Sequence, residues 1–143
     1  MDKLIDCIEY SDKRKILTCR ENGIEYRITN DLETRICKVK IDGCLDQGKG
    51  EKRCDYLFFT EELEVNKAIF VELKGTRLKD AINQIIDSIN YLREEFIGHT
   101  KYARIIGKGD VPRFVNFPEY KRLHGLVYGN IKRSTNKILE ESI

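Results

Sequence analysis

The longest regular pattern of apolar residues in the chain lies between residues 77 and 97. Apolar side chains recur there every three or four positions, which places them on one face of an α-helix. Thr76 can cap the start of this helix, and Gly98 can end it. The pattern predicts one long amphipathic helix, whose apolar face is formed by Leu78, Ala81, Ile82, Ile85, Ile86, Ile89, Leu92 and Phe96.

Shorter apolar stretches with the length of β-strands precede this helix. Residues 36–41 alternate between polar and apolar, as in a strand with one buried face. Residues 54–59 and 68–74 are apolar almost throughout, as in central strands, and the polar residues 60–67 predict that the two pair as an antiparallel hairpin. Weaker patterns predict a short N-terminal helix, strands at 24–28, 102–106 and 123–128, and a helix at 131–142.

Helices and strands are therefore mixed along the chain, which predicts an α/β protein with one mixed β-sheet flanked by α-helices. The chain has 143 residues, the size of one domain, and no repeat or linker divides residues 1–143. No apolar segment approaches the ~18 residues of a membrane span. The acidic residues near the N-terminus are unlike a signal peptide. We therefore expect a single cytoplasmic domain that does not associate with a membrane.

The charge of the chain is unevenly distributed. Lys and Arg number 26 and Asp and Glu number 24, so the net charge is only +2. Residues 101–143 nevertheless hold nine basic and four acidic residues, a local balance of +5 that can attract a polyanion. Within this segment Arg113, Lys121 and Arg122 are candidate contacts to nucleic-acid phosphates. The alternative explanation is an ordinary solvated surface.

The chain contains five cysteines, an odd number with no pair two residues apart. A structural zinc site usually needs such close pairs, so none is predicted. A disulfide framework is not expected without a secretion signal. We therefore expect reduced thiols, and Cys37 and Cys54 should behave as small apolar residues inside strands.

Charged residues inside the two most apolar strands are the candidate chemistry. Burying a carboxylate or an ammonium is costly unless the group is paired or bound to a metal. The period of two places Glu72 and Lys74 on one face of their strand, and the hairpin brings Asp55 nearly opposite Glu72. Neighbouring carboxylates repel each other unless one is protonated or a cation lies between them, and oxygen ligands suit Mg²⁺ or Mn²⁺. The alternative explanation is a strand-edge salt bridge between Glu72 and Lys74.

This pattern resembles the motif of the PD-(D/E)XK nuclease superfamily. Asp55 is followed, after a 16-residue gap, by Glu72-Leu73-Lys74, and the resemblance covers roughly residues 36–97. It implies a restriction-endonuclease-like core and hydrolysis of phosphodiester bonds. It also implies that Asp55, Glu72 and the carbonyl of Leu73 bind the metal, while Lys74 assists the attacking water. Cys54 stands where the name of the family has proline.

Two residues near this motif are accessory candidates. Gln84 lies ten residues after Lys74 in the predicted helix. RecB-like nucleases carry a Gln in this helix with an aromatic residue four positions later, whereas here position 88 is Ser. Asp42 follows the strand at 36–41 and could approach the metal, although a turn-forming Asp-Gly is the commoner explanation.

Many members of the superfamily also have an acid on their first helix. The candidates for that acid in this chain are Glu9, Asp31 and Glu33, and the sequence does not choose among them.

The sequence therefore predicts a Mg²⁺-dependent deoxyribonuclease, with Mn²⁺ expected to substitute for Mg²⁺. An endonuclease acting on DNA is favoured, RNA remains an alternative substrate, and the compact chain could act as a homodimer. Two other functions stay open. One is a non-catalytic nucleic-acid-binding module with the same fold, and the other is a protein-interaction domain whose charges are structural. The presence of both acids and the lysine favours the nuclease.

Overall fold

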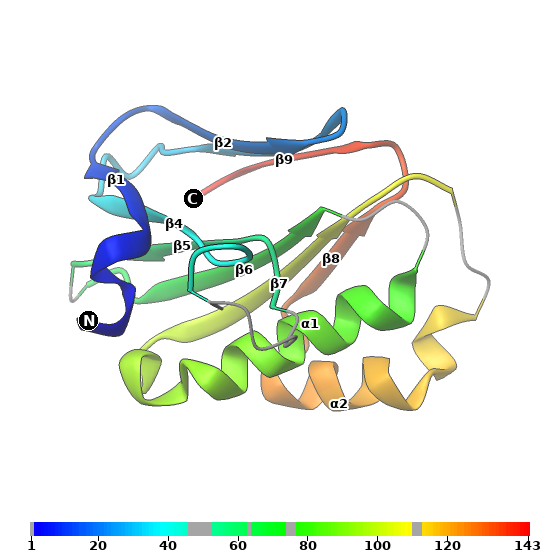
Figure 1. Cartoon of the computed structure of the whole chain (residues 1–143). Helices are drawn as coiled ribbons and strands as arrows, with labels where there is room; N and C mark the ends of the chain where they lie inside the picture. The colour runs from blue at the N-terminus through cyan, green and yellow to red at the C-terminus, as the bar shows by residue number, and fades with distance from the viewer. Residues whose placement is uncertain (1, 46–52, 63, 74–76, 110–112) are drawn as a thin grey trace.

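The computed structural model describes residues 2–45, 53–62, 64–73, 77–109 and 113–143. These residues form three layers (Figure 1). In this described part of the chain, a six-stranded sheet is the middle layer, two α-helices cover one of its faces, and a three-stranded sheet covers the other. The mixed α/β class predicted from the sequence is confirmed.

The six-stranded sheet places the most apolar strands of the chain at its centre. Four strands that pair antiparallel come first, and two more follow parallel to the fourth. Every residue of the central strand β5 is buried, which explains its almost continuous apolar sequence. The order across the sheet is β1 (Ile8–Asp12), β4 (Ile36–Lys40), β5 (Tyr56–Thr60), β6 (Lys67–Leu73), β7 (Thr100–Ile106) and β8 (Ile131–Ser134).

The helical layer begins with α1 (Leu78–Tyr91), which connects β6 to its parallel neighbour β7. The long helix predicted at 77–97 is confirmed, except that its last turn is the 3₁₀-helix η2 (Arg93–Phe96). Thr76, the expected cap, lies outside the described residues. Phe96 packs edge-on against Phe59 and Phe70 of the sheet, with ring centroids 5.1 and 6.3 Å apart. These aromatic contacts fix the end of the helix layer to the central hairpin.

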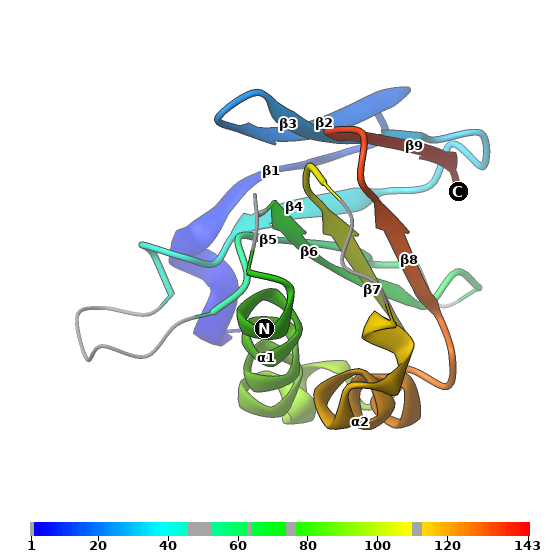
Figure 2. The same cartoon turned by 90° about the vertical axis from the view of Figure 1, so that its right-hand side faces the viewer.

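Beside α1 lies α2 (Pro118–Leu126), which the short 3₁₀-helix η3 (Phe114–Asn116) precedes (Figure 2). Both helices cover the same face of the six-stranded sheet. No described α-helix is long and apolar enough to cross a membrane.

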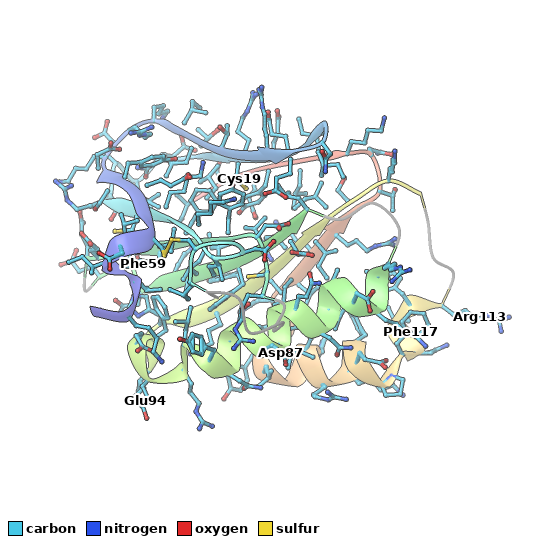
Figure 3. All side chains as sticks on the ribbon, in the orientation of Figure 1. Cys19, Phe59, Asp87, Glu94, Arg113 and Phe117 are labelled. Atoms are coloured by element: carbon cyan, nitrogen blue, oxygen red, sulfur yellow. A yellow bond between two sulfur atoms is a disulfide. The ribbon has the colours of Figure 1, made fainter. Side chains whose placement is uncertain are left out.

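The opposite face of the six-stranded sheet is covered by strands rather than helices. The second sheet has the order β2 (Ile16–Glu21), β3 (Ile24–Thr29) and β9 (Ile138–Ser142), and β9 runs parallel to β3. Figure 3 shows Cys19 between the two sheets, in a core built from Leu17, Tyr26, Ile28, Phe58, Ile69 and Val71 among others. The prediction of one sheet flanked by helices is therefore wrong for this face.

Two elements predicted in the last third of the chain are also wrong. The strand predicted at 123–128 is instead the last turn of α2 and the residues that follow it. Leu123 and Val127 are buried there at the four-residue spacing of a helix. Residues 131–142 were expected to form a helix, but they form β8 and β9. Each of these strands pairs in parallel with a distant partner, β7 or β3, so tertiary pairing overrides the local pattern.

A disulfide bond contradicts the expectation that all cysteines are reduced. Cys7, at the end of the 3₁₀-helix η1 (Asp2–Cys7), is bonded to Cys44 in the turn after β4, with the Cα atoms 5.9 Å apart. The two are 37 residues apart in sequence, so no close spacing marks them as a pair. Cys19, Cys37 and Cys54 are buried free thiols, and burial raises the pKa of Cys37 to about 12.

A buried ion pair joins the two sheets. Nε and Nη2 of Arg104 on β7 donate to the two carboxylate oxygens of Glu141 on β9, at 2.5 and 3.2 Å. The hydroxyl of Tyr26 on β3 donates to the same carboxylate at 2.6 Å. Burial alone would raise the pKa of Glu141, but the hydrogen bonds from Arg104 and Tyr26 outweigh it and hold the pKa below its usual value.

Replacing Glu141 with Gln should destabilise the folded chain in a pH-dependent way. Because folding lowers the pKa of Glu141, the ionised carboxylate stabilises the fold above its ordinary pKa, and this contribution is lost as the pH falls through the folded-state pKa. At pH 7 the free energy of unfolding should fall by about 2 kcal/mol, and the deficit should shrink below about pH 4.5. Urea unfolding across this range measures both effects.

The matched control is Glu140→Gln, which removes a neighbouring, more exposed carboxylate paired with Arg27 at 3.4 Å. Its effect should stay within about 0.5 kcal/mol. Equal losses for the two variants, or a deficit for Glu141→Gln that does not change with pH, would contradict the role given to the buried pair.

Candidate metal centre

The pairing of β5 with β6 sets Asp55 beside Glu72. Tyr56 is opposite Val71 in this antiparallel pair, so the next position along the hairpin puts Asp55 opposite Glu72. The backbone N–H of Asp55 is shared between the carbonyl of Val71 and Oε1 of Glu72, both at 3.1 Å. The N–H of Leu73 donates to Oδ2 of Asp55 at 2.8 Å. The predicted hairpin and the near-opposition of the two acids are confirmed.

Both carboxylates are removed from solvent. Asp55 is 5% exposed and Glu72 is fully buried. Burial raises the pKa of Asp55, and the hydrogen bond from Leu73 and the interaction with Glu72 only partly offset this. The charges of Glu21 and Asp42 raise the pKa further, so negative charge is concentrated around Asp55.

Two further acids approach the pair from different parts of the fold. Asp42 is exposed in the turn that follows β4, and the neighbouring N–H of Ile41 donates to the carbonyl of Asp55 at 3.0 Å. The accessory candidate Asp42 is therefore near the centre. Glu21 ends β2 in the other sheet and forms a 3.6 Å ion pair with Lys40. No feature of the sequence marks Glu21, because only the packing of the two sheets brings it to Asp55.

The other acids considered for this role lie elsewhere. Glu33 lies shortly before the first residue of β4, whereas Asp55 lies beside the last residues of β4. The length of the strand therefore separates the two acids. Glu9 pairs with Lys38 at 3.0 Å, and Asp31 pairs with Lys15 at 2.9 Å. The structure therefore does not bring Glu33 to the pair of carboxylates.

The donor set suits a hard divalent cation. Carboxylate and carbonyl oxygens are the ligands that Mg²⁺ and Mn²⁺ prefer, and Mg²⁺ sites often use only one or two carboxylates. Asp55 and Glu72 supply those carboxylates, and the resemblance adds the carbonyl of Leu73. Within the described ranges, no group of three or more His, Cys, Asp or Glu side chains could hold a metal ion. Lys74 lies outside the described residues.

The helix layer is tied to this centre by Ser88 of α1, one turn after the accessory candidate Gln84. Both are buried, although Gln84 belongs to a polar residue type that is usually exposed. The hydroxyl of Ser88 donates to the carbonyl of Gln84 at 2.8 Å and accepts the N–H of Cys54 at 2.9 Å. The segment that enters β5 is thus tied to α1 directly before Asp55.

The predicted phosphate contacts lie where η3 leads into α2. Arg113, Lys121 and Arg122 are all exposed, and Figure 3 shows Arg113 extending outward at this end of the helix layer. The ammonium of Lys79, in the first turn of α1, lies 4.7 Å from the ring centroid of Phe117. Leu73 is opposite Ile106 in the parallel pair of β6 and β7, so the segments that lead to Lys79 and to Arg113 leave the sheet at the same end, next to Glu72.

Two aromatic residues of this region, Phe114 and Phe117, have cationic partners. The guanidinium of Arg133 lies 4.9 Å from the ring centroid of Phe114, and Phe114 packs edge-on against Tyr120 at 5.3 Å. Phe114 and Phe117 therefore each have a cation against the ring.

Comparison of the chain with protein-family models, with curated proteins and with solved structures gave no match in any of the three. Membership of the PD-(D/E)XK superfamily therefore stays a prediction from the residues of the motif.

Reversing the charges of Lys121 and Arg122 should weaken the binding of DNA. If each side chain neutralises one phosphate, the double variant Lys121→Glu/Arg122→Glu should reduce the slope of log affinity against log salt by about 2. Fluorescence anisotropy with labelled DNA in EDTA, at several salt concentrations, measures the slope without cleavage.

The control is Lys13→Glu/Arg14→Glu, which reverses the charges of another pair of adjacent, exposed basic residues. This pair follows the end of β1, which pairs with the start of β4. It should change the slope by less than one unit, because it lies away from the acidic centre. Identical slopes for both double variants would show that the basic excess is only a solvated surface.

Proposed function

We propose that the chain is a Mg²⁺-dependent nuclease that hydrolyses phosphodiester bonds in DNA, with a restriction-endonuclease-like core. One observation carries the proposal. Asp55 and Glu72, two carboxylates in the most apolar hairpin of the chain, are buried and linked through backbone hydrogen bonds. If the two acids had no role, apolar residues would be expected at these positions, because burial of like charges is costly.

The surrounding fold supports the same conclusion. The acid at the start of β5 is followed by Glu72 at the end of β6, by the amphipathic helix α1 and by the parallel strand β7. The resemblance to the superfamily describes this order from acid to helix. A strand-edge salt bridge between Glu72 and Lys74, the alternative explanation, would leave the burial of Asp55 unexplained.

In the proposed mechanism, Asp55, Glu72 and the carbonyl of Leu73 would hold the divalent ion. Mg²⁺, when bound, lowers the pKa of a water and stabilises negative charge on the phosphate in the transition state. Lys74 is assigned by the sequence motif alone to orient the attacking water or to neutralise developing charge. Arg113, Lys121 and Arg122 would bind neighbouring phosphates and so position the nucleic-acid backbone.

The purified chain should cut DNA in Mg²⁺ or Mn²⁺ and stop in EDTA. Asp55→Asn and Glu72→Gln should abolish cleavage with little change in shape, because an amide cannot replace the charge of a carboxylate. Lys74→Met should lower the rate on the order of 10²-fold while Mn²⁺ still binds. A cleavage assay on linear, single-stranded and branched DNA and on RNA measures these rates.

Glu140→Gln is the control for loss of a carboxylate away from the centre and should cut like the wild-type chain. If the wild-type chain cuts no substrate but still binds DNA, the non-catalytic binding module is the better account. If the Asp55 and Glu72 variants cut as fast as the wild-type chain, the site assignment is wrong.

A further inference from the structure

Ser88 is a polar residue on the buried face of α1. Its side chain is fully buried, and it lies among the apolar residues by which the helix packs on the six-stranded sheet. Its hydroxyl accepts the N–H of Cys54 at 2.9 Å and donates to the carbonyl of Gln84 at 2.8 Å. The bond to Gln84 alone would satisfy the hydroxyl within the helix. The bond from Cys54 is different, because it joins two layers of the fold.

The bond matters more for the N–H of Cys54 than for the hydroxyl of Ser88. Cys54 is fully buried and precedes β5, so neither water nor a regular strand ladder is available to its N–H. The next residue is Asp55, whose N–H and carbonyl bond to Val71 and Ile41 of the neighbouring chain segments. Those two bonds hold Asp55 within the sheet, whereas the bond from Cys54 to Ser88 holds the preceding peptide against the helix.

We propose that Ser88 is a positioning residue for the metal centre, which it serves by fixing the peptide that precedes Asp55. The inference rests on the proposed function, since it concerns the same carboxylates. It also accounts for one departure from the motif, because a proline at position 54 would have no N–H to donate to Ser88. Residues that orient metal ligands typically change metal affinity by 10- to 100-fold when they are replaced.

The test compares Ser88→Ala with Thr60→Val. Thr60 is 1% exposed, its hydroxyl accepts the N–H of Lys67 at 2.9 Å, and it donates to the carbonyl of Val65. It therefore makes the same pair of bonds at the other end of the hairpin of β5 and β6. Both variants should unfold at lower urea concentration than the wild-type chain. Only Ser88→Ala should also raise the Kd for Mn²⁺, by about 10-fold or more in calorimetry, while Thr60→Val stays within about twofold.

A variant that keeps an acceptor atom at this position covers the case in which Ser88→Ala does not fold. Ser88→Cys retains a weak acceptor at the same place and should bind Mn²⁺ with an affinity between those of the wild-type chain and Ser88→Ala. Wild-type affinity in whichever Ser88 variant folds, or an equal loss in Thr60→Val, would overturn the positioning role. Failure of the proposed function is recognised separately: the wild-type chain would then show no Mn²⁺ binding that Glu72→Gln removes.

Discussion

The antiparallel register of β5 and β6 is the constraint on which the candidate centre depends. It sets Tyr56 opposite Val71 and therefore Asp55 opposite Glu72, and three backbone hydrogen bonds around the two acids lock that position. The register is in turn fixed by burial on both faces, because a slip of one residue would exchange the residues that face the helices with those that face the second sheet. The core of the protein and its candidate chemistry thus rest on one strand pairing.

The two outer layers make this burial possible in different ways. The helices cover one face with aliphatic side chains, and Ser88 adds a polar tie to the peptide before Asp55. The three-stranded sheet covers the other face and is held by the buried pair of Arg104 and Glu141. That sheet also brings Glu21 close enough to raise the pKa of Asp55. Negative charge is therefore gathered at one edge of the sheet, and basic residues lie at the adjoining end of the helix layer.

The elements that the sequence predicted well are those with the strongest periodicity or the most continuous burial. The hairpin of β5 and β6 and the helix α1 belong to this group, and so does the opposition of Asp55 and Glu72. The helix predicted at 131–142 was wrong because β8 and β9 are short strands whose partners, β7 and β3, are distant in sequence. For the same reason the bond between Cys7 and Cys44 and the approach of Glu21 could not be predicted, since only the tertiary fold creates those proximities.

The most direct test of the central claim is a crystal of the chain soaked in Mn²⁺ and measured for anomalous scattering. We expect an anomalous peak between Asp55 and Glu72, with at least one oxygen of each carboxylate at about 2.2 Å from the ion. The peak should be absent from crystals of Glu72→Gln soaked in the same way. Anomalous peaks confined to surface carboxylates, with none at this pair, would contradict the claim that these two buried acids form a metal centre.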